Sequence, residues 1–245
     1  MRSYAIGDIH GQLGLLQSAH ARIAADRKAN GDSDAPVVHL GDLVDRGPDS
    51  AGVIRYLREG VAAGAPWVVL KGNHDRLFER FIMTPDWRDP KMSDDVSYLH
   101  PVVGGAETLM SYGLFRPTAF HLRTVREQAR AAVPEADLAF LASRPLTHMV
   151  GEALFVHAGI RPGVPLDQQI EQDLIWIREP FLSDTRDHGC LIVHGHTAIP
   201  RPIHYRNRVN IDSRAGYGGP LSAIVIEGRD VWVLTEGGRV PLTPN

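Results

Sequence analysis

Five short apolar segments of this chain each end in a glycine-containing turn that carries side chains able to bind metals. The segments are YAIGDIHG (4–11), VVHLGDLVDRG (37–47), VVLKGNHD (68–75), LFVHAG (154–159) and LIVHGHT (191–197). Uninterrupted aliphatic runs of this length are typical of strands buried on both faces, in a sheet covered by helices. We therefore predict an α/β fold with its site at the carboxyl ends of the strands, where ligands bind in open α/β sheets.

The segments between these runs extend the prediction to the whole chain. Residues 13–29 and 49–64 have helical patterns, so the chain begins β-α-β-α-β, and Asp49 or Ser50 is suited to cap the second helix. From about 76 to 150 the strand pattern gives way to helices and loops, which predicts a mostly helical insertion. RVNID, LSAIVIEG and DVWVLTEGG predict two or three later strands, partly antiparallel. With no repeat or linker evident, we expect a single domain, 1–245.

Composition excludes several classes of protein. The net charge is −3 and no block of like charges occurs, which argues against a nucleic-acid-binding or anionic-membrane surface. No run of about 18 apolar residues is present, and the chain enters a strand pattern at once, so we expect a cytoplasmic protein. Cys190 is the only cysteine, which leaves neither a disulfide framework nor a thiolate metal site, whereas twelve histidines suggest ligands or catalytic groups.

Side chains with oxygen or nitrogen donors follow all five strands. They are Asp8, His10, Asp42, Asn73, His157 and His196. Without thiolates, this set favours Mn²⁺, Fe²⁺ or Zn²⁺. It is too large for one tetrahedral zinc and suits two divalent ions, roughly 3.5–4 Å apart, that share a carboxylate. Because only two of the donors are anionic, the loaded cluster stays positive, which would attract phosphate and acidify water. This predicts hydrolysis of a phosphate ester.

The motifs GDIHG, GDLVDRG, GNHD, VHAG and GHT resemble those of calcineurin-like metallophosphoesterases, specifically the phosphoprotein phosphatase family. The resemblance spans residues 4 to about 197 and is strongest to small bacterial serine/threonine phosphatases, next to diadenosine tetraphosphatases. It implies a β sandwich flanked by helices with a dinuclear site at the strand ends. One metal would take Asp8, His10 and Asp42, and Asp42 would bridge to the other. The second metal would be completed by Asn73, His157 and His196. Mn²⁺ is the expected ion, with Fe or Zn as alternatives.

The resemblance also implies catalytic roles beside the metals. His74 matches the general acid that protonates the leaving oxygen while a hydroxide bridging the metals attacks phosphorus in line. Asp45 matches the carboxylate that keeps this imidazole protonated, since a nearby negative charge favours the charged form. Arg46 matches a phosphate-binding arginine, whose planar fork suits two phosphate oxygens, and Arg178 in WIRE is a second candidate.

Three functions remain open. We expect hydrolysis of phosphoserine or phosphothreonine in proteins, with activity on small aryl phosphates. The alternative is hydrolysis of diadenosine tetraphosphate by the same centre, because relatives of that kind often read GDLVARG where this chain has GDLVDRG. The third is an inactive phosphoprotein-binding module. The oligomeric state cannot be predicted.

Several neighbours of these motifs have plainer expected roles. Asp75 is expected to cap a helix, Gly72 to allow a sharp turn, and His39 to be a satisfied core residue. His194 is expected to pack or support a ligand rather than bind metal. Arg161 could contact substrate or have a plain loop role, and Tyr217 could border the site or pack in its turn. Arg214 lies in NIDSRAG, where relatives are expected to read closer to NIDTGA, so its bulk alters the expected shape of that rim.

Overall fold

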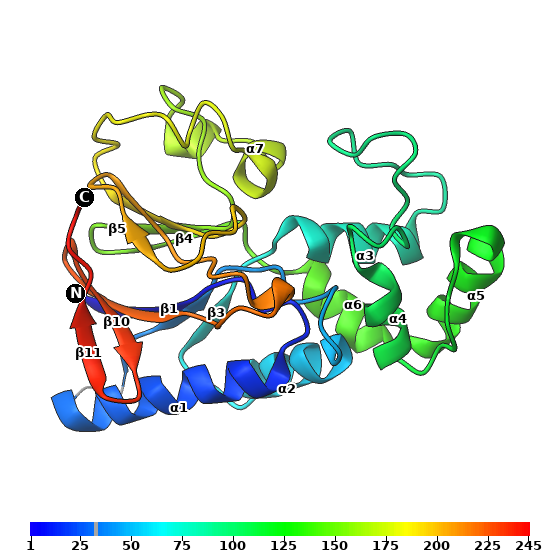
Figure 1. Cartoon of the computed structure of the whole chain (residues 1–245), viewed down its shortest axis with the longest axis horizontal. Helices are drawn as coiled ribbons and strands as arrows, with labels where there is room; N and C mark the ends of the chain where they lie inside the picture. Colours follow the sequence, from blue (N-terminus) through cyan, green and yellow to red (C-terminus); the bar gives the residue numbers. More distant parts are fainter. Residues whose placement is uncertain (32–33) are drawn as a thin grey trace.

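The computed structural model describes residues 1–31 and 34–245, which form two β-sheets packed face to face with helices outside both (Figure 1). In this described part, the first sheet has the order β11-β10-β9-β1-β2-β3 and the second the order β4-β5-β6-β8-β7. The strands of the first are β1 (Arg2–Ile6), β2 (Val37–His39), β3 (Trp67–Val69), β9 (Ala223–Glu227), β10 (Asp230–Thr235) and β11 (Gly238–Pro241). Those of the second are β4 (Thr147–Val150), β5 (Ala153–Val156), β6 (Leu191–His194), β7 (Ile203–His204) and β8 (Arg208–Asn210).

Each sheet has a parallel centre and antiparallel edges. β1 pairs in parallel with β2 and β2 with β3, while β9, β10 and β11 continue the sheet in antiparallel pairs. In the second sheet β5, β6 and β8 are parallel, and β4 and β7 are antiparallel to their neighbours. The carboxyl ends of the parallel strands therefore lie at one end of the sandwich. This arrangement confirms the predicted sandwich with its site at the strand ends.

Helices cover the outer faces and one end of the sandwich. They are α1 (Leu13–Asn30), α2 (Ser50–Ala62), α3 (Asn73–Met83), α4 (Gly105–Ser111), α5 (Leu122–Ala132), α6 (Glu135–Ala142) and α7 (Glu171–Trp176), with 3₁₀ turns η1 (Ala119–His121), η2 (Leu166–Gln168) and η3 (Ala215–Tyr217). Figure 1 shows α1 and α2 below the first sheet, α7 above the second, and α3–α6 together at one end. None of the helices in the described part of the chain combines the length and apolar character that a membrane span needs.

Alternating side chains along the strands divide the core into layers. Ala5 and Val38 of the first sheet and Phe155 and Val193 of the second point inward and pack between the sheets. Their chain neighbours point outward: Tyr4 packs among the helices under the first sheet, and the outer face of β5 and β6 packs near α7. Since a strand exposes its residues to opposite faces in turn, strands covered on both sides must be apolar throughout. This explains the uninterrupted apolar runs.

The insertion differs from the mostly helical segment that was predicted for residues 76–150. The first helix begins at Asn73, so two site residues lie in its first turn, and β4 is a strand inside the range predicted to be helical. β4 is only four residues long, and Gly151 joins it to β5 with a φ of 57°, a conformation that favours glycine. The loop from 84 to 104 is turns and irregular backbone. The short strands β7 and β11 were also not predicted.

Candidate active site

The six predicted metal ligands converge at the carboxyl ends of the parallel strands of both sheets. Asp8 and His10 follow β1, Asp42 follows β2, and Asn73 begins α3 directly after the β3 segment. The second sheet adds two histidines, one after β5 and one after β6. All six side chains are buried. Residues 188 positions apart in the chain therefore meet, as in the hydrogen bond from the His196 N–H to Asp8 Oδ2 at 2.9 Å.

Asp42 lies at the centre of this cluster. His10 Nε2 is 3.5 Å from Asp42 Oδ2, and His157 Nε2 is 3.3 Å from Asp42 Oδ1. Asn73 Oδ1 lies 2.9 Å from both His157 Nε2 and His196 Nδ1. The donor atoms form two groups that share Asp42, one with His10 and His74 and the other with His157 and His196. A carboxylate shared between two donor groups is the arrangement expected for a pair of ions.

Backbone carbonyl groups fix the ring orientations of two histidines. His10 Nδ1 donates to the Val44 carbonyl at 2.8 Å, and His157 Nδ1 donates to the Leu40 carbonyl at 2.9 Å. In each ring this leaves Nε2 as the unprotonated nitrogen, within 3.5 Å of an Asp42 oxygen. Backbone carbonyls that hold the second nitrogen are the usual support for metal-binding histidines.

The charges of the cluster fit a divalent cation. Burial lowers the pKa of His10 to about 3 and lowers the pKa values of His157 and His196, which keeps these imidazoles neutral. Burial, together with repulsion from Asp212 and Asp42, raises the pKa of Asp8 well above its usual range. In the described part of the chain the buried Asp8 Oδ1 has no hydrogen-bond partner. A divalent ion bound here would take the lone pairs of the neutral imidazoles and would compensate the charge of the Asp8 carboxylate.

His74 and Asp45 meet directly. His74 Nδ1 donates to Asp45 Oδ2 at 2.7 Å, and both side chains are buried. The other oxygen of Asp45 accepts from the Tyr98 hydroxyl at 2.6 Å and from Thr108 Oγ1 at 2.7 Å. Thr108 Oγ1 also accepts the Asp45 N–H at 2.8 Å. The orientation of the His74 ring therefore depends on two side chains from the insertion, which sequence reasoning did not identify.

Arg46 lies between the two parts of the site. Its Nη1 donates to His10 Nε2 at 2.7 Å, its Nη2 donates to His74 Nε2 at 3.0 Å, and its guanidinium lies 4.5 Å from the centre of the Tyr217 ring. The guanidinium thus faces both a ligand candidate and the acid candidate. The N–H groups of an arginine in this position could instead bind the oxygens of a phosphoryl group.

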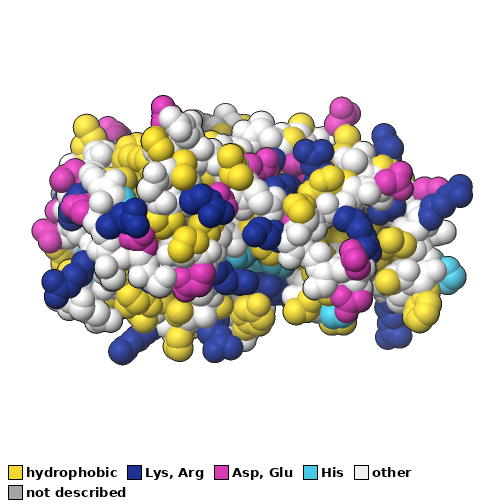
Figure 2. All heavy atoms as spheres, turned by 90° about the horizontal axis from the view of Figure 1, so that it is seen from above, with side chains coloured by type: hydrophobic (Ala, Val, Ile, Leu, Met, Phe, Trp, Pro, Cys, Tyr) yellow, Lys and Arg dark blue, Asp and Glu magenta, His cyan; other side chains and the backbone are white. Residues whose placement is uncertain are grey.

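A cleft of about 290 Å³ opens over the cluster. Three cations line it, Arg46, Lys91 and Arg178, and so do two aromatic residues, Trp176 and Tyr217. Histidine atoms are visible in a recess near the middle of the face in Figure 2, with arginine and lysine side chains around it. The positive charge of Arg178 contributes to the lowered pKa of His196, after burial and His157. The sequence reasoning did not include Lys91 in the site.

Several site residues adopt left-handed backbone conformations. The φ angles are 47° at His10, 48° at Asp42, 73° at Asp45, 69° at Arg46 and 62° at His196. For residues with a Cβ this region is costly, and such residues concentrate where surrounding structure holds them in place for function. Sharp turns at the strand ends thus aim these side chains at one point.

Gly72 has a different role from the predicted one. Its backbone is extended, with φ −95° and ψ 176°, so no sharp turn requires a glycine here. A Cβ at this position would lie 2.2 Å from Asp42 Oδ1 and 2.3 Å from the Asp42 nitrogen. Glycine is needed because α3 begins in contact with Asp42. Asp75 accepts the Gly72 N–H and the Leu43 N–H, each at 2.8 Å, which confirms the prediction that it caps the helix start.

The ambiguous residues are also placed. Arg161 makes two 2.6 Å hydrogen bonds to Asp173 in the first turn of α7. His194 is buried and bonded to Arg208, as expected of a packing residue. Arg214 has a φ of 70°, which explains why glycine would suit this position. His39 is buried and contacts the Val68 carbonyl and His20, which confirms a satisfied core histidine.

Asp212 also lies at the cleft and was missed. It is buried, and burial, with a contribution from Asp42, raises its pKa to about 6. The sequence did carry a signal for Asp212, because it follows the strand predicted in RVNID. That strand pairs in parallel with β6, so its end is of the same kind as the strand ends that carry the six predicted ligands.

Comparison with known proteins identifies the family. The pattern described as Calcineurin-like phosphoesterase matches residues 1–224. The chain belongs to the calcineurin-like phosphoesterases. As a member, it is a hydrolytic enzyme that depends on divalent metal ions, which confirms the expected enzyme and argues against the third alternative, an inactive binding module.

Curated relatives match most of the chain. A bis(5'-nucleosyl)-tetraphosphatase PrpE [asymmetrical] from Bacillus thuringiensis is 24% identical, over 91% of this chain and 90% of the relative. One from Halalkalibacterium halodurans is 26% identical, over 89% and 87%.

Solved structures share the fold. A structure provisionally assigned as a diadenosine tetraphosphatase has a TM-score of 0.64 and 23% identity, covering 100% of this chain and 95% of its own. A cold-active protein-tyrosine phosphatase from a psychrophilic Shewanella species has a TM-score of 0.61 and 19% identity, covering 99% and 80%.

Proposed function

We propose that this metallophosphoesterase hydrolyses dinucleoside tetraphosphates asymmetrically, cleaving an outer phosphoanhydride to give a nucleoside monophosphate and a nucleoside triphosphate. The observation that carries the proposal is the concentration of cations in the cleft. Arg46, Lys91 and Arg178 all line it beside the Asp42 cluster, which is more positive charge than a single phosphate requires. The names of relatives that match about nine-tenths of the chain support the same substrate class.

The metal ligands are assigned to the predicted residues. Asp8, His10 and Asp42 would hold one divalent ion, and Asp42, Asn73, His157 and His196 the other. We propose Mn²⁺ for both, since the donors are oxygen and imidazole nitrogen without a thiolate. When bound, the ions supply Lewis acidity toward a phosphoryl oxygen and lower the cost of forming hydroxide near neutral pH.

The protein's own groups complete the reaction. Arg46 and Arg178 bind non-bridging oxygens and orient the phosphoryl group. His74 is positioned by Asp45 to donate a proton from Nε2 to the leaving oxygen, which lets Asp45 compensate the positive charge of the imidazolium.

Phosphomonoester hydrolysis, including that of phosphoserine and phosphothreonine, is the second candidate. The specific observation that favours it is the 2.7 Å contact between His74 and Asp45. An alkoxide needs a proton as it leaves, whereas a nucleotide leaves as a stable phosphate anion and needs an acid less. This difference gives a physical reason for the alanine of GDLVARG in dinucleotide hydrolases and for the aspartate of GDLVDRG, Asp45 in this chain, in monoesterases.

One comparison of substrates tests the proposal. The protein is reconstituted with Mn²⁺, and kcat/KM is measured for diadenosine tetraphosphate, a phosphoserine peptide and p-nitrophenyl phosphate. We expect the dinucleotide to have the highest value, with ATP and AMP as its products. Exclusive turnover of the phosphopeptide and the aryl ester would transfer the assignment to phosphomonoester hydrolysis, and two molecules of ADP would contradict asymmetrical cleavage.

A further inference from the structure

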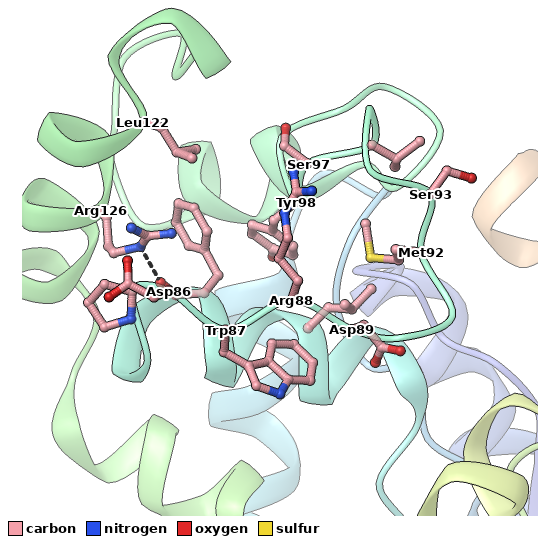
Figure 3. Close-up of a pocket in the computed structure, with 14 residues that line it drawn as sticks. Asp86, Trp87, Arg88, Asp89, Met92, Ser93, Ser97, Tyr98, Leu122 and Arg126 are labelled. Carbon is pink, nitrogen blue, oxygen red and sulfur yellow. Dashed lines mark hydrogen bonds between the residues drawn. The ribbon is translucent and has the colours of Figure 1, made fainter.

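A second cavity, of about 310 Å³, lies beside the reaction cleft within the helical insertion (Figure 3). It is formed by α3, α5 and the loop that follows α3. Leu77, Met92, Ser93 and Val96 line both this cavity and the reaction cleft, so the two are adjacent. A molecule whose phosphate occupies the cleft therefore has a second cavity next to it into which its nucleoside could extend.

The lining of this cavity differs in chemistry from that of the reaction cleft. Its wall is mainly apolar and aromatic: Leu77, Phe81, Trp87, Met92, Val96 and Tyr98. Two arginines and two aspartates line the cavity, so the charges of its lining residues cancel. Both arginines are also engaged, Arg126 with the Phe81 carbonyl at 2.7 Å and Arg88 with the Asp94 carbonyl at 2.7 Å. The cavity thus suits a neutral, flat group rather than a phosphate.

The aromatic wall is held in place by surrounding contacts. The Arg76 and Arg80 guanidinium groups of α3 lie 5.7 and 5.8 Å from the centre of the Trp87 ring. The Tyr98 ring lies 4.8 Å from that of Phe81, and its hydroxyl donates to Asp45. Because these rings are fixed, a stacked ligand would lose little affinity to ordering them.

The loop between the cavity and α7 is anchored as well. Asp89 is buried and accepts hydrogen bonds from Arg76 of α3 and from the Trp176 indole of α7, the latter at 3.1 Å. This connection spans the cavity side and the cleft side of the site. The loop that carries Trp87 and Met92 is therefore part of the fixed wall.

We propose that this cavity binds the base of the nucleoside joined to the phosphate that is attacked. The inference rests on the proposed function, which supplies a substrate with a base at each end. Its basis is the combination of three features: a position next to the reaction cleft, aromatic side chains in the wall, and lining residues whose charges cancel. Stacking on aromatic side chains accepts any base, so the site would discriminate nucleotides from simple phosphate esters more than one base from another.

The test uses Trp87→Ala, with Trp87→Phe as the variant that retains an aromatic face. The quantity measured is kcat/KM for diadenosine tetraphosphate divided by kcat/KM for p-nitrophenyl phosphate. We expect Trp87→Ala to lower this ratio about 10-fold or more, and Trp87→Phe to recover most of it. Phe120→Ala is the matched control, since Phe120 is an aromatic residue of the same insertion that is 94% exposed. It should leave the ratio unchanged.

A binding measurement separates this inference from the proposed function. AMP binding to the Mn²⁺ protein and to the two Trp87 variants is measured by calorimetry. If the wild type does not hydrolyse the dinucleotide but Trp87→Ala weakens AMP binding about 10-fold, the base site stands and the proposed function fails. If the dinucleotide is hydrolysed and Trp87→Ala changes neither the ratio nor AMP binding, the base site is overturned.

Two further outcomes also decide the inference. An equal loss on both substrates, with AMP binding unchanged, overturns it in favour of a structural role for Trp87. Selective loss on the phosphoserine peptide, with the nucleotide measurements unchanged, assigns the cavity to a peptide side chain and overturns the base assignment.

Discussion

The metal cluster and the helical insertion are built in opposite ways. The cluster consists of buried residues that follow the ends of strands, and three of them, His10, Asp42 and His196, have left-handed backbone angles. The insertion consists of short helices and a long loop, and it leaves apolar side chains exposed, with Phe115 at 87% and Phe120 at 94%. The comparison indicates that the sandwich fixes the reaction while the insertion shapes what reaches it.

The two regions are nevertheless joined at Asp45. Tyr98 and Thr108 of the insertion hold the carboxylate of Asp45, which in turn holds His74. The insertion thus contributes to proton transfer as well as to the shape of the cleft. Substitutions in the cluster should remove activity on every substrate, whereas those in the insertion should change activity selectively.

The largest effect is expected from Asp42→Asn. Asp42 is shared by both donor groups, so its neutral amide should lower kcat/KM about 10³-fold on every substrate. Activity and bound Mn²⁺ are measured together, by turnover of p-nitrophenyl phosphate and by elemental analysis. Asp167→Asn, a change of the same kind in an exposed turn, is the control. Activity equal to that of the control, or turnover that persists after chelation, would refute the assigned cluster.

A smaller and substrate-dependent effect is expected from His74→Asn. Removal of a general acid should lower kcat about 10²-fold for phenyl phosphate, whose leaving group needs a proton. The loss should be smaller for p-nitrophenyl phosphate, which releases a more stable anion. Steady-state rates for the two esters check this, and equal losses on both would show that His74 acts in another way.

Thr108→Val tests the connection between the two regions. Valine keeps the shape of the side chain but removes the hydroxyl that bonds twice to Asp45. We expect kcat for phenyl phosphate to fall about 10-fold, since a buried polar group that loses its hydrogen-bond partner costs about 1–3 kcal/mol. The loss should again be smaller on p-nitrophenyl phosphate, and Thr108→Ser should restore activity on both. A uniform loss with no rescue by serine would separate the insertion from proton transfer.

The smallest effect concerns histidines outside the site. Burial lowers the pKa of His39 to about 3 and that of His20 to about 4. Both are neutral when folded but have a pKa near 6.5 when unfolded, so the unfolded chain gains protons first as the pH falls. The stability that the protein has with both histidines neutral is therefore complete above pH 6.5 and is lost as the pH falls toward 4.

Urea unfolding at pH 7.5 and 5.5 measures this contribution. His39→Gln should reduce the pH-dependent loss of stability by about 1 kcal/mol relative to wild type. His121→Gln, at an exposed position, is the control. Parallel pH profiles for wild type and His39→Gln would contradict the expected neutral state of His39.

The sequence predicted the main strands and the six clustered residues because both depend on local signals repeated along the chain, whereas the sandwich was implied by the resemblance of the motifs to a known family. An apolar run followed by a glycine and a ligand residue is visible without any knowledge of tertiary structure. Tyr98 and Thr108 carry no such signal, since an ordinary tyrosine and threonine become important only by lying within hydrogen-bond distance of Asp45. The role of Gly72 depended likewise on a contact with Asp42, which no pattern around residue 72 encodes.

The left-handed backbone at five site residues has a consequence for protein engineering. Each such residue costs about 1–2 kcal/mol relative to an ordinary conformation, and glycine would remove much of that cost. A library selected only for heat resistance would therefore favour glycine at His10, Asp42 or His196, and would enrich more stable variants that have lost catalytic activity. Any effort to stabilise this enzyme must score turnover in the same round as thermal tolerance.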